Sequence, residues 1–194
     1  MQWYSANYDG VLRLAGETKR KVLVYFWMDG SDHCARLWGE TLAKPEMAAL
    51  LNQFVCFSAT ATSANGRALV QRYSIATLPT LLIADHNGVA DDIAVGYQSQ
   101  NLVQGTLTRI LNGQGTVTQL RSVASADPKD LQKRCALAIK LADVGDIRTA
   151  RVLFDSIRSE DPEGRSQAGA RVLLRAVIEE IQARAAKAGD RTTW

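Results

Sequence analysis

The sequence predicts an α/β domain with a mixed central sheet, followed by an all-helical unit. Over residues 1–113, short apolar runs alternate with helical patterns in the order β-α-β-α-β-β-α, which is typical of a sheet covered by helices. Residues 114–126 are rich in glycine, serine and threonine and predict a linker. Residues 127–190 show only the helical spacing of apolar residues. We therefore expect two structural units joined by a short irregular segment.

The first half of the domain alternates helices and strands. Apolar residues between positions 11 and 15 predict a short helix. The run KRKVLVYFW (19–27) is short and almost continuously apolar, which favours a buried strand. A helix is expected after Ser31, and Pro45 should interrupt it near Lys44. QFVCFSA (53–59) then predicts a second strand, and NGRALVQRYS (65–74) predicts a short helix.

The second half of the domain adds a hairpin and a last helix. TLPTLLIAD (77–85) predicts a third strand, with Pro79 near its start, where a missing N–H costs little. HNG (86–88) is a turn signal, and DIAVGY (92–97) predicts the fourth strand. QNLVQGTLTRILNG (100–113) predicts a helix that ends at Gly113. Strands joined by helices and by a hairpin together imply a mixed sheet.

The helical unit shows its own start and stop signals. Asp127-Pro128 predicts an N-cap followed by proline at the first helical position. Gly145 should end this helix and Asp146 should cap the next, which Asp161-Pro162 should end. A third helix carries apolar residues at helical spacing between positions 170 and 181.

Composition argues against several classes of protein. With 23 Lys+Arg against 20 Asp+Glu and no basic block, nucleic-acid binding is not predicted. No window approaches the roughly 20 apolar residues of a membrane span. The start MQWYSANYDG lacks a charged segment followed by an apolar one, so no export signal is predicted, although a signal or anchor already removed would leave the same start.

The cysteine pattern argues against a disulfide framework or a metal site. The three cysteines are widely spaced, no CxxC pair occurs, and the only histidines are His33 and His86. These features favour reduced thiols in a cytoplasm, and we expect no metal and no cofactor. Cys56 and Cys135 are expected in the core, although a bond between Cys34 and Cys56 is left open.

Three ordered segments resemble the thioredoxin superfamily. KVLVYFW followed by SDHC is similar to the family's strand, its Phe-Trp pair and the start of its active-site helix. YSIATLPT is similar to the segment that presents the family's cis-proline, which makes Pro79 the counterpart. AVGYQSQNLVQGTLTRIL resembles the family's glycine loop and final helix. The resemblance covers roughly residues 5–112 and implies a thioredoxin fold.

The departures from this resemblance concern the chemistry. Ser31 stands where the family has its nucleophilic cysteine, and a hydroxyl cannot attack a disulfide at neutral pH, although serine is a good helix N-cap. Cys34 fills the position of the second, resolving cysteine. Tyr25 replaces the family's buried aspartate, and Gly30 replaces the tryptophan before the first cysteine. The two-cysteine exchange cycle therefore cannot run through this motif.

The resemblance also implies a groove that holds an extended peptide beside the cis-proline. Its expected residues are those near the SxxC motif, the proline and the glycine loop: Trp27, Gly30, Asp32, His33, Leu78, Pro79, Gly96 and Tyr97. The sequence thus predicts a protein- or peptide-binding, chaperone-like module.

Two alternatives stay open. A single-thiol oxidoreductase, either thiol-disulfide or glutathione-linked, would use Cys34 if His33 lowers the pKa of the thiol. Alternatively, the natural residue at position 31 is a cysteine and the chain is a variant of a thiol-disulfide oxidoreductase.

The segment LAIKLADVGDIRTARVLFDSIRSEDP resembles a tetratricopeptide repeat. Gly145, Ala150, Phe154 and Pro162 fall at characteristic positions of that repeat, and Ala138 supplies a small residue for close packing. Repeat arrays need about three units to be stable alone. A single unit should therefore lean on the first domain, on a partner or on a second copy, which allows a homodimer through the helical unit. A plain helical hairpin that only enlarges the core is the alternative.

Overall fold

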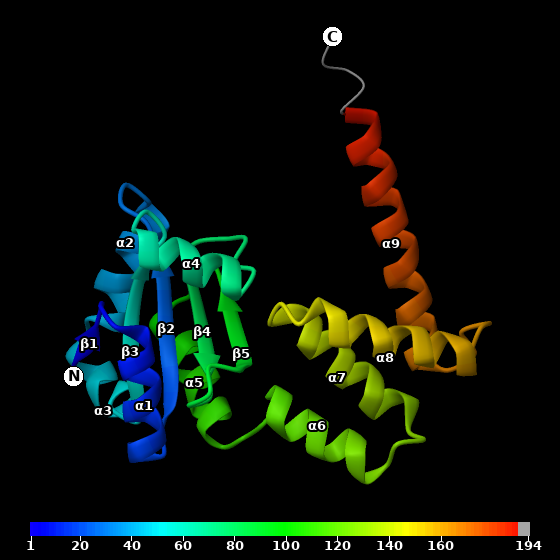
Figure 1. Cartoon of the computed structure of the whole chain (residues 1–194), viewed down its shortest axis with the longest axis horizontal. Helices are drawn as coiled ribbons and strands as arrows, with labels where there is room; N and C mark the ends of the chain where they lie inside the picture. Colours follow the sequence, from blue (N-terminus) through cyan, green and yellow to red (C-terminus); the bar gives the residue numbers. More distant parts are fainter. Residues whose placement is uncertain (190–194) are drawn as a thin grey trace. The chain divides into compact units, whose positions relative to one another are not determined.

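The computed structural model of this chain describes residues 1–189, and the side chains of residues 1–181. The boundary expected at position 190 and the tail beyond it lie outside the described residues. The chain divides into two compact units (Figure 1). The first holds Met1–Gln119 with the short segment Asp143–Gly145, and the second holds Leu120–Ala142 and the chain from Asp146 onward.

A five-stranded sheet forms the centre of the first unit. Its strands are β1 (Trp3–Tyr4), β2 (Lys21–Trp27), β3 (Phe54–Thr60), β4 (Thr80–Ala84) and β5 (Ala90–Val95). Their order in the sheet is β1-β3-β2-β4-β5. Strand β3 runs parallel to both β1 and β2, whereas β4 runs antiparallel to β2 and β5. The expected mixed sheet is confirmed (Figure 1).

Helices cover both faces of this sheet because side chains along a strand alternate between the faces. Leu23 and Tyr25 of β2 join the core under α2 (Asp32–Leu37), a π-helical turn (Trp38–Leu42), a 3₁₀ turn (Pro45–Met47), α3 (Ala48–Leu51) and α5 (Gln100–Leu111). Val22, Val24 and Phe26 join the core under α1 (Tyr8–Thr18) and α4 (Ala64–Arg72). Pro45 interrupts the helical segment after Ser31 as predicted.

Strand β1 was not predicted. It is two residues long and pairs through Trp3 and Tyr4 with Cys56 and Phe57 of β3. Two residues cannot show the alternation by which a strand is identified in a sequence.

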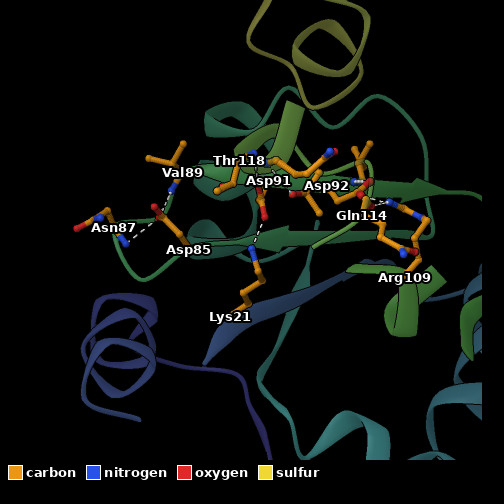
Figure 2. A network of polar contacts seen from close by, with 12 residues as sticks. Lys21, Asp85, Asn87, Val89, Asp91, Asp92, Arg109, Gln114 and Thr118 are labelled. Carbon is orange, nitrogen blue, oxygen red and sulfur yellow. Dashed lines mark hydrogen bonds and ion pairs between the residues drawn. The ribbon is translucent and has the colours of Figure 1, made fainter. Parts of the chain in front are cut away.

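The hairpin predicted at HNG is present between β4 and β5. One carboxylate oxygen of Asp85 accepts hydrogen bonds from the amides of Asn87 (2.9 Å) and Val89 (2.8 Å) (Figure 2). Gly88 has a φ of 73°, a left-handed value that glycine adopts without steric cost. The local turn chemistry thus sets the register that brings β5 beside β4.

The expectation of an irregular linker over residues 114–126 was wrong for most of that segment. Val117–Ala126 form helix α6, whose start is held in the first unit. The amide of Thr118 donates to the buried carboxylate of Asp91 (2.7 Å), and Arg109 donates to the carbonyl of Gln114 (Figure 2). Backbone groups of this segment thus pair with Asp91 and Arg109 of the first unit, which composition alone does not reveal.

The second unit is all-helical, as predicted. Besides most of α6, it contains α7 (Leu131–Asp143) except for its last residue, together with α8 (Ile147–Glu160) and α9 (Gln167–Gly189). Asp146 caps α8 through the amide of Thr149 (3.2 Å), and α8 ends directly before Asp161. The cap expected at Asp127 was wrong. α7 starts at Leu131, and Asp130 accepts from the amides of Gln132 (2.8 Å) and Lys133 (3.1 Å).

Cys135 packs in the core of the helical unit with Ile157, Ala168 and Val172, as expected. Burial raises the pKa of its thiol. Within residues 1–189, none of the helices combines the length and the apolar composition that crossing a membrane requires.

Candidate functional site at the Ser31–Cys34 turn

The site is built where β2 gives way to α2. Strand β2 ends at Trp27, and the chain turns through Met28–Gly30. Gly30 has a φ of 75°, a left-handed backbone that disfavours any residue with a Cβ. Ser31 then adopts an extended conformation, and its Oγ accepts a hydrogen bond from the amide of Cys34 (3.4 Å). Ser31 is therefore the N-cap of α2, as its residue type predicts.

Cys34 lies beneath this cap. It is 2% exposed, and its carbonyl accepts a hydrogen bond from the hydroxyl of Tyr25 (2.8 Å). Burial, and then the neighbouring Cys34 thiol, raise the pKa of the Tyr25 hydroxyl, so it stays a protonated donor. Where the resemblance would place an acid, the structure thus has a neutral phenol.

The three thiols are free and buried, so the open alternative of a bond between Cys34 and Cys56 is not realised. Cys56 lies in the core as expected, with its thiol 3.4 Å from the carbonyl oxygen of Leu51. Burial raises the pKa of Cys56 to about 12.

Aromatic rings form the wall behind the turn. The ring of Tyr25 stacks on that of Trp27 (centroids 6.4 Å apart, planes at 11°) and on that of Trp38 (5.8 Å, 21°). Trp3 from β1 meets the Tyr25 and Trp38 rings edge-on, at 6.2 Å and 5.3 Å. The indole N–H of Trp27 donates to the hydroxyl of Ser58 (2.8 Å). These contacts fix the rings around the end of β2.

Between the turn and this wall lies a cavity of about 280 Å³, which we call the aromatic cavity. Its lining comes from β2, the turn, α2, Trp38 and β3: Tyr25, Trp27, Met28, Asp29, Gly30, Ser31, Cys34, Ala35, Trp38 and Ser58. The site can therefore accept an apolar group beside a thiol and two serine hydroxyls.

The proline segment lies at the same edge of the sheet. The Leu78–Pro79 bond is cis, and the carbonyl of Pro79 accepts a hydrogen bond from the amide of Gly96 (2.8 Å). Because β2 and β4 are antiparallel with Phe26 opposite Thr80, Pro79 comes beside the end of β2 at Trp27. Among the described residues, the amide and carbonyl of half-buried Leu78 have no hydrogen-bond partner.

The remaining predicted residues lie around these two elements. Asp32 and His33 are exposed in the first turn of α2. The Tyr97 side chain makes contacts within the protein: its hydroxyl donates a hydrogen bond to Glu40 (2.5 Å), and the Arg36 guanidinium lies 4.3 Å from the centre of its ring. Tyr97 thus ties the glycine loop to α2 and the π-helical turn after it.

The structure brings Trp27, Gly30, Ser31 and Cys34 together around one cavity, and it places Leu78, Pro79 and Gly96 at the same edge of the sheet. The sequence analysis missed Trp38 and Ser58 as lining residues. Trp38 follows Cys34 by four positions, a helical spacing that could have indicated it. Ser58 of β3 lies opposite Tyr25 of the neighbouring strand β2, a pairing that no local sequence pattern reveals.

Comparison with known proteins supports the fold of the first unit. A sequence model described as thioredoxin-like domain matches residues 8–110. No curated protein matches the chain. Similar solved structures include a thioredoxin from Thermus thermophilus, 24% identical, covering 57% of this chain and 87% of that one with a TM-score of 0.51. The oxidised C-terminal domain of DsbD from Neisseria meningitidis is 15% identical and covers 56% and 98%, with a TM-score of 0.49. The likeness to the Thermus protein confirms the expected thioredoxin fold and extends no further.

Proposed function

The chain belongs to the family of thioredoxin-like domains, which matches more than half of its length, and we propose that it binds a protein or peptide partner, as a chaperone-like module, without dithiol exchange. The observation that carries this proposal is the role of Ser31. Dithiol exchange needs a thiolate at the start of the active-site helix. The first position of this motif holds Ser31, whose hydroxyl oxygen accepts a hydrogen bond from the Cys34 amide and so caps the helix.

The binding role is supported by the backbone beside the cis-proline. Extended peptides bind by adding main-chain hydrogen bonds to exposed backbone groups. The amide and carbonyl of Leu78 lack partners within residues 1–189, and they lie at the edge of the sheet where β2 ends. A peptide held there would pass Trp27 and Gly30 and come near the exposed Asp32 and His33.

A titration of the ¹⁵N-labelled chain with an unfolded polypeptide, reduced and carboxymethylated α-lactalbumin, tests this function. We expect the amide signals of Leu78, Gly96 and Ser31 to shift. Leu78→Glu should weaken binding at least tenfold, because it places a charge at the groove. Val89→Glu, at an exposed residue of the β4–β5 turn, should bind like the parent chain. Unchanged signals at Leu78 and Gly96 would contradict the proposal.

The single-thiol alternative depends on Cys34, whose 2% exposure argues against ready access to bulky disulfides. Alkylation by iodoacetamide as a function of pH separates the two functions. A rate that rises only near the pKa of an ordinary thiol supports binding without redox chemistry. Fast alkylation at pH 6 that Cys34→Ala abolishes would favour the oxidoreductase.

The other alternative, a natural cysteine at position 31, is decided by the gene sequence at that codon. The variant Ser31→Cys offers a further check in the insulin reduction assay. We expect this variant to reduce insulin far more slowly than an active thioredoxin does, because Tyr25 supplies no acid beside Cys34.

The proposal also covers the binding partner of the helical unit and the cellular compartment of the protein. α9 exposes the apolar residues Leu174, Val177, Ile178 and Ile181, which leaves room for a client or for a second copy of the chain. Light scattering across a concentration series distinguishes a monomer of 21.2 kDa from a dimer. Three free thiols are compatible with the reducing cytoplasm, which we propose as the location.

A further inference from the structure

The aromatic cavity is large enough to hold part of a ligand. Cavities of roughly 150 Å³ accommodate benzene. The volume of about 280 Å³ beside Ser31 therefore has room for a substituted aromatic ring. It is also open at its rim, since a Cβ added at Gly30 would meet no atom within 4 Å.

The walls of the cavity favour a ring over an aliphatic chain. Tyr25, Trp27 and Trp38 supply aromatic surface, and their contacts with one another and with Ser58 hold them in place. Aromatic rings attract one another in offset-stacked or edge-on arrangements, which adds to the burial of apolar area. A second ring entering this space gains both contributions without reorganising the wall.

Two hydroxyl groups give the cavity polarity without charge. The Oγ of Ser58 accepts from Trp27, and the Oγ of Ser31 accepts from the Cys34 amide. Neither hydroxyl proton has an acceptor within the part of the chain that the structure describes. Each can therefore donate to a ligand oxygen.

The lining disfavours an anion. It includes no lysine or arginine, and it includes the carboxylate of Asp29. Burying a negative group here would cost desolvation that no nearby cation offsets. The ligand group that fits is neutral, aromatic and able to accept a hydrogen bond.

We propose that the aromatic cavity binds one neutral aromatic side chain of the partner polypeptide, with tyrosine preferred over phenylalanine. This inference rests on the proposed peptide-binding function, because Leu78 and the cavity lie at the same edge of the sheet. A peptide held by the Leu78 backbone places one side chain in the cavity, which makes binding selective for sequences with an aromatic residue.

The test uses small neutral probes, N-acetyl-tyrosinamide, N-acetyl-phenylalaninamide and N-acetyl-leucinamide, together with tetramethylammonium. The indole N–H signal of Trp27 and the methyl signal of Met28 report on the cavity. We expect the tyrosine and phenylalanine probes to shift both signals, and the leucine probe to bind at least fivefold more weakly. Ser58→Ala should reduce the preference for tyrosine over phenylalanine.

Two alanine-to-phenylalanine substitutions form a matched pair, one that fills the cavity and one that lies away from it. Ala35 is an exposed helical residue that lines the cavity, and Ala49 is an exposed helical residue of α3 that does not. Ala35→Phe should abolish binding of the aromatic probes, and Ala49→Phe should leave it intact. Equal effects of the two variants would overturn the proposal.

The outcomes separate this inference from the proposed function. If the unfolded polypeptide binds equally well to Ala35→Phe and the probes shift nothing, the cavity proposal fails and the binding function stands. If the aromatic probes bind but the polypeptide does not, the peptide-binding function fails and the cavity remains a site for aromatic groups. Shifts caused only by tetramethylammonium would overturn the proposal in favour of a cation site.

Discussion

Two regions of the first unit differ in whether their polar groups have used all of their hydrogen-bonding capacity. One surrounds the adjacent aspartates of β5, Asp91 and Asp92, which are 2% and 0% exposed (Figure 2). The other surrounds Ser31 and Cys34. Both contain buried polar atoms, yet only the second leaves hydrogen-bonding capacity unused beside a cavity.

In the aspartate network, each carboxylate has a cation and an amide. Asp91 pairs with Lys21 of β2 and accepts from the amide of Thr118, whereas Asp92 pairs with Arg109 of α5 (2.8 Å) and accepts from the amide of Ile93 (2.8 Å). The two aspartates thereby tie β5 to β2, to α5 and to the start of α6. This is the pattern of a structural clamp.

At the Ser31 turn, the hydroxyl protons of Ser31 and Ser58 and the backbone of Leu78 have no hydrogen-bond partner within the described chain, and both hydroxyls line the aromatic cavity. Each of the two Oγ atoms accepts one hydrogen bond, so these groups keep a remaining donor that a ligand in the cavity can use. The polar groups around Asp91 and Asp92 are therefore paired inside the fold, whereas those around Ser31 keep unused hydrogen-bonding capacity.

The largest effect is expected from Asp92→Ala. It leaves Arg109 without its buried partner and removes the acceptor of the Ile93 amide. Loss of one member of a buried pair costs about 3 kcal/mol of unfolding free energy. Urea denaturation should show this loss, while Glu17→Ala on the exposed end of α1 should stay within about 0.5 kcal/mol of the parent. A loss near that of the control would contradict the structural role of Asp92.

Acid should weaken the same clamp through Asp91. Burial alone would raise the pKa of Asp91, but the Lys21 ammonium and the Thr118 amide outweigh it and hold the pKa below its ordinary value of 3.8. A lowered folded-state pKa contributes stability above pH 3.8 that is lost as the pH falls through the folded-state value.

The Asp91→Asn variant should therefore be less stable than the parent at pH 7. Its stability should also depend less on pH between pH 5 and 2 than that of the parent. Urea midpoints at a series of pH values measure this dependence. Asp9→Asn on α1 serves as the control. An equally steep loss in Asp91→Asn and in the parent would rule out Asp91 as its source.

A smaller effect is expected from Tyr25→Phe in the wall of the aromatic cavity. The variant loses the hydrogen bond to the Cys34 carbonyl but keeps the ring in the cavity wall. We expect a loss of about 1 kcal/mol in unfolding free energy. Binding of N-acetyl-tyrosinamide should change less than twofold. Tyr4→Phe, whose hydroxyl has no hydrogen-bond partner in the described residues, is the matched control for stability.

The smallest effect is expected from Ser31→Ala. The cap bond to the Cys34 amide is long at 3.4 Å, and α2 has six residues, so the loss should be about 0.5 kcal/mol. Ser63→Ala, which removes a 3.0 Å cap from α4, should cost about 1 kcal/mol. Thermal unfolding of both variants measures the difference. A larger loss for Ser31→Ala would give this serine a structural role beyond capping.

The sequence alone determined the order of the helices and of the four longer strands in the first unit, and the capping role of Ser31. Apolar periodicity and cap chemistry act between residues a few positions apart, so one sequence shows them. The resemblance on which the fold expectation rested used the same short segments, SDHC and YSIATLPT.

The tertiary structure alone decided which distant residues meet. Lys21 reaches Asp91 across 70 positions, and Ser58 reaches Trp27 across 31. The helix in the glycine-rich segment starts where Asp91 holds the Thr118 amide, and the aromatic cavity forms where two strands and a helix converge. Such contacts depend on strand register and helix packing, which local periodicity does not encode.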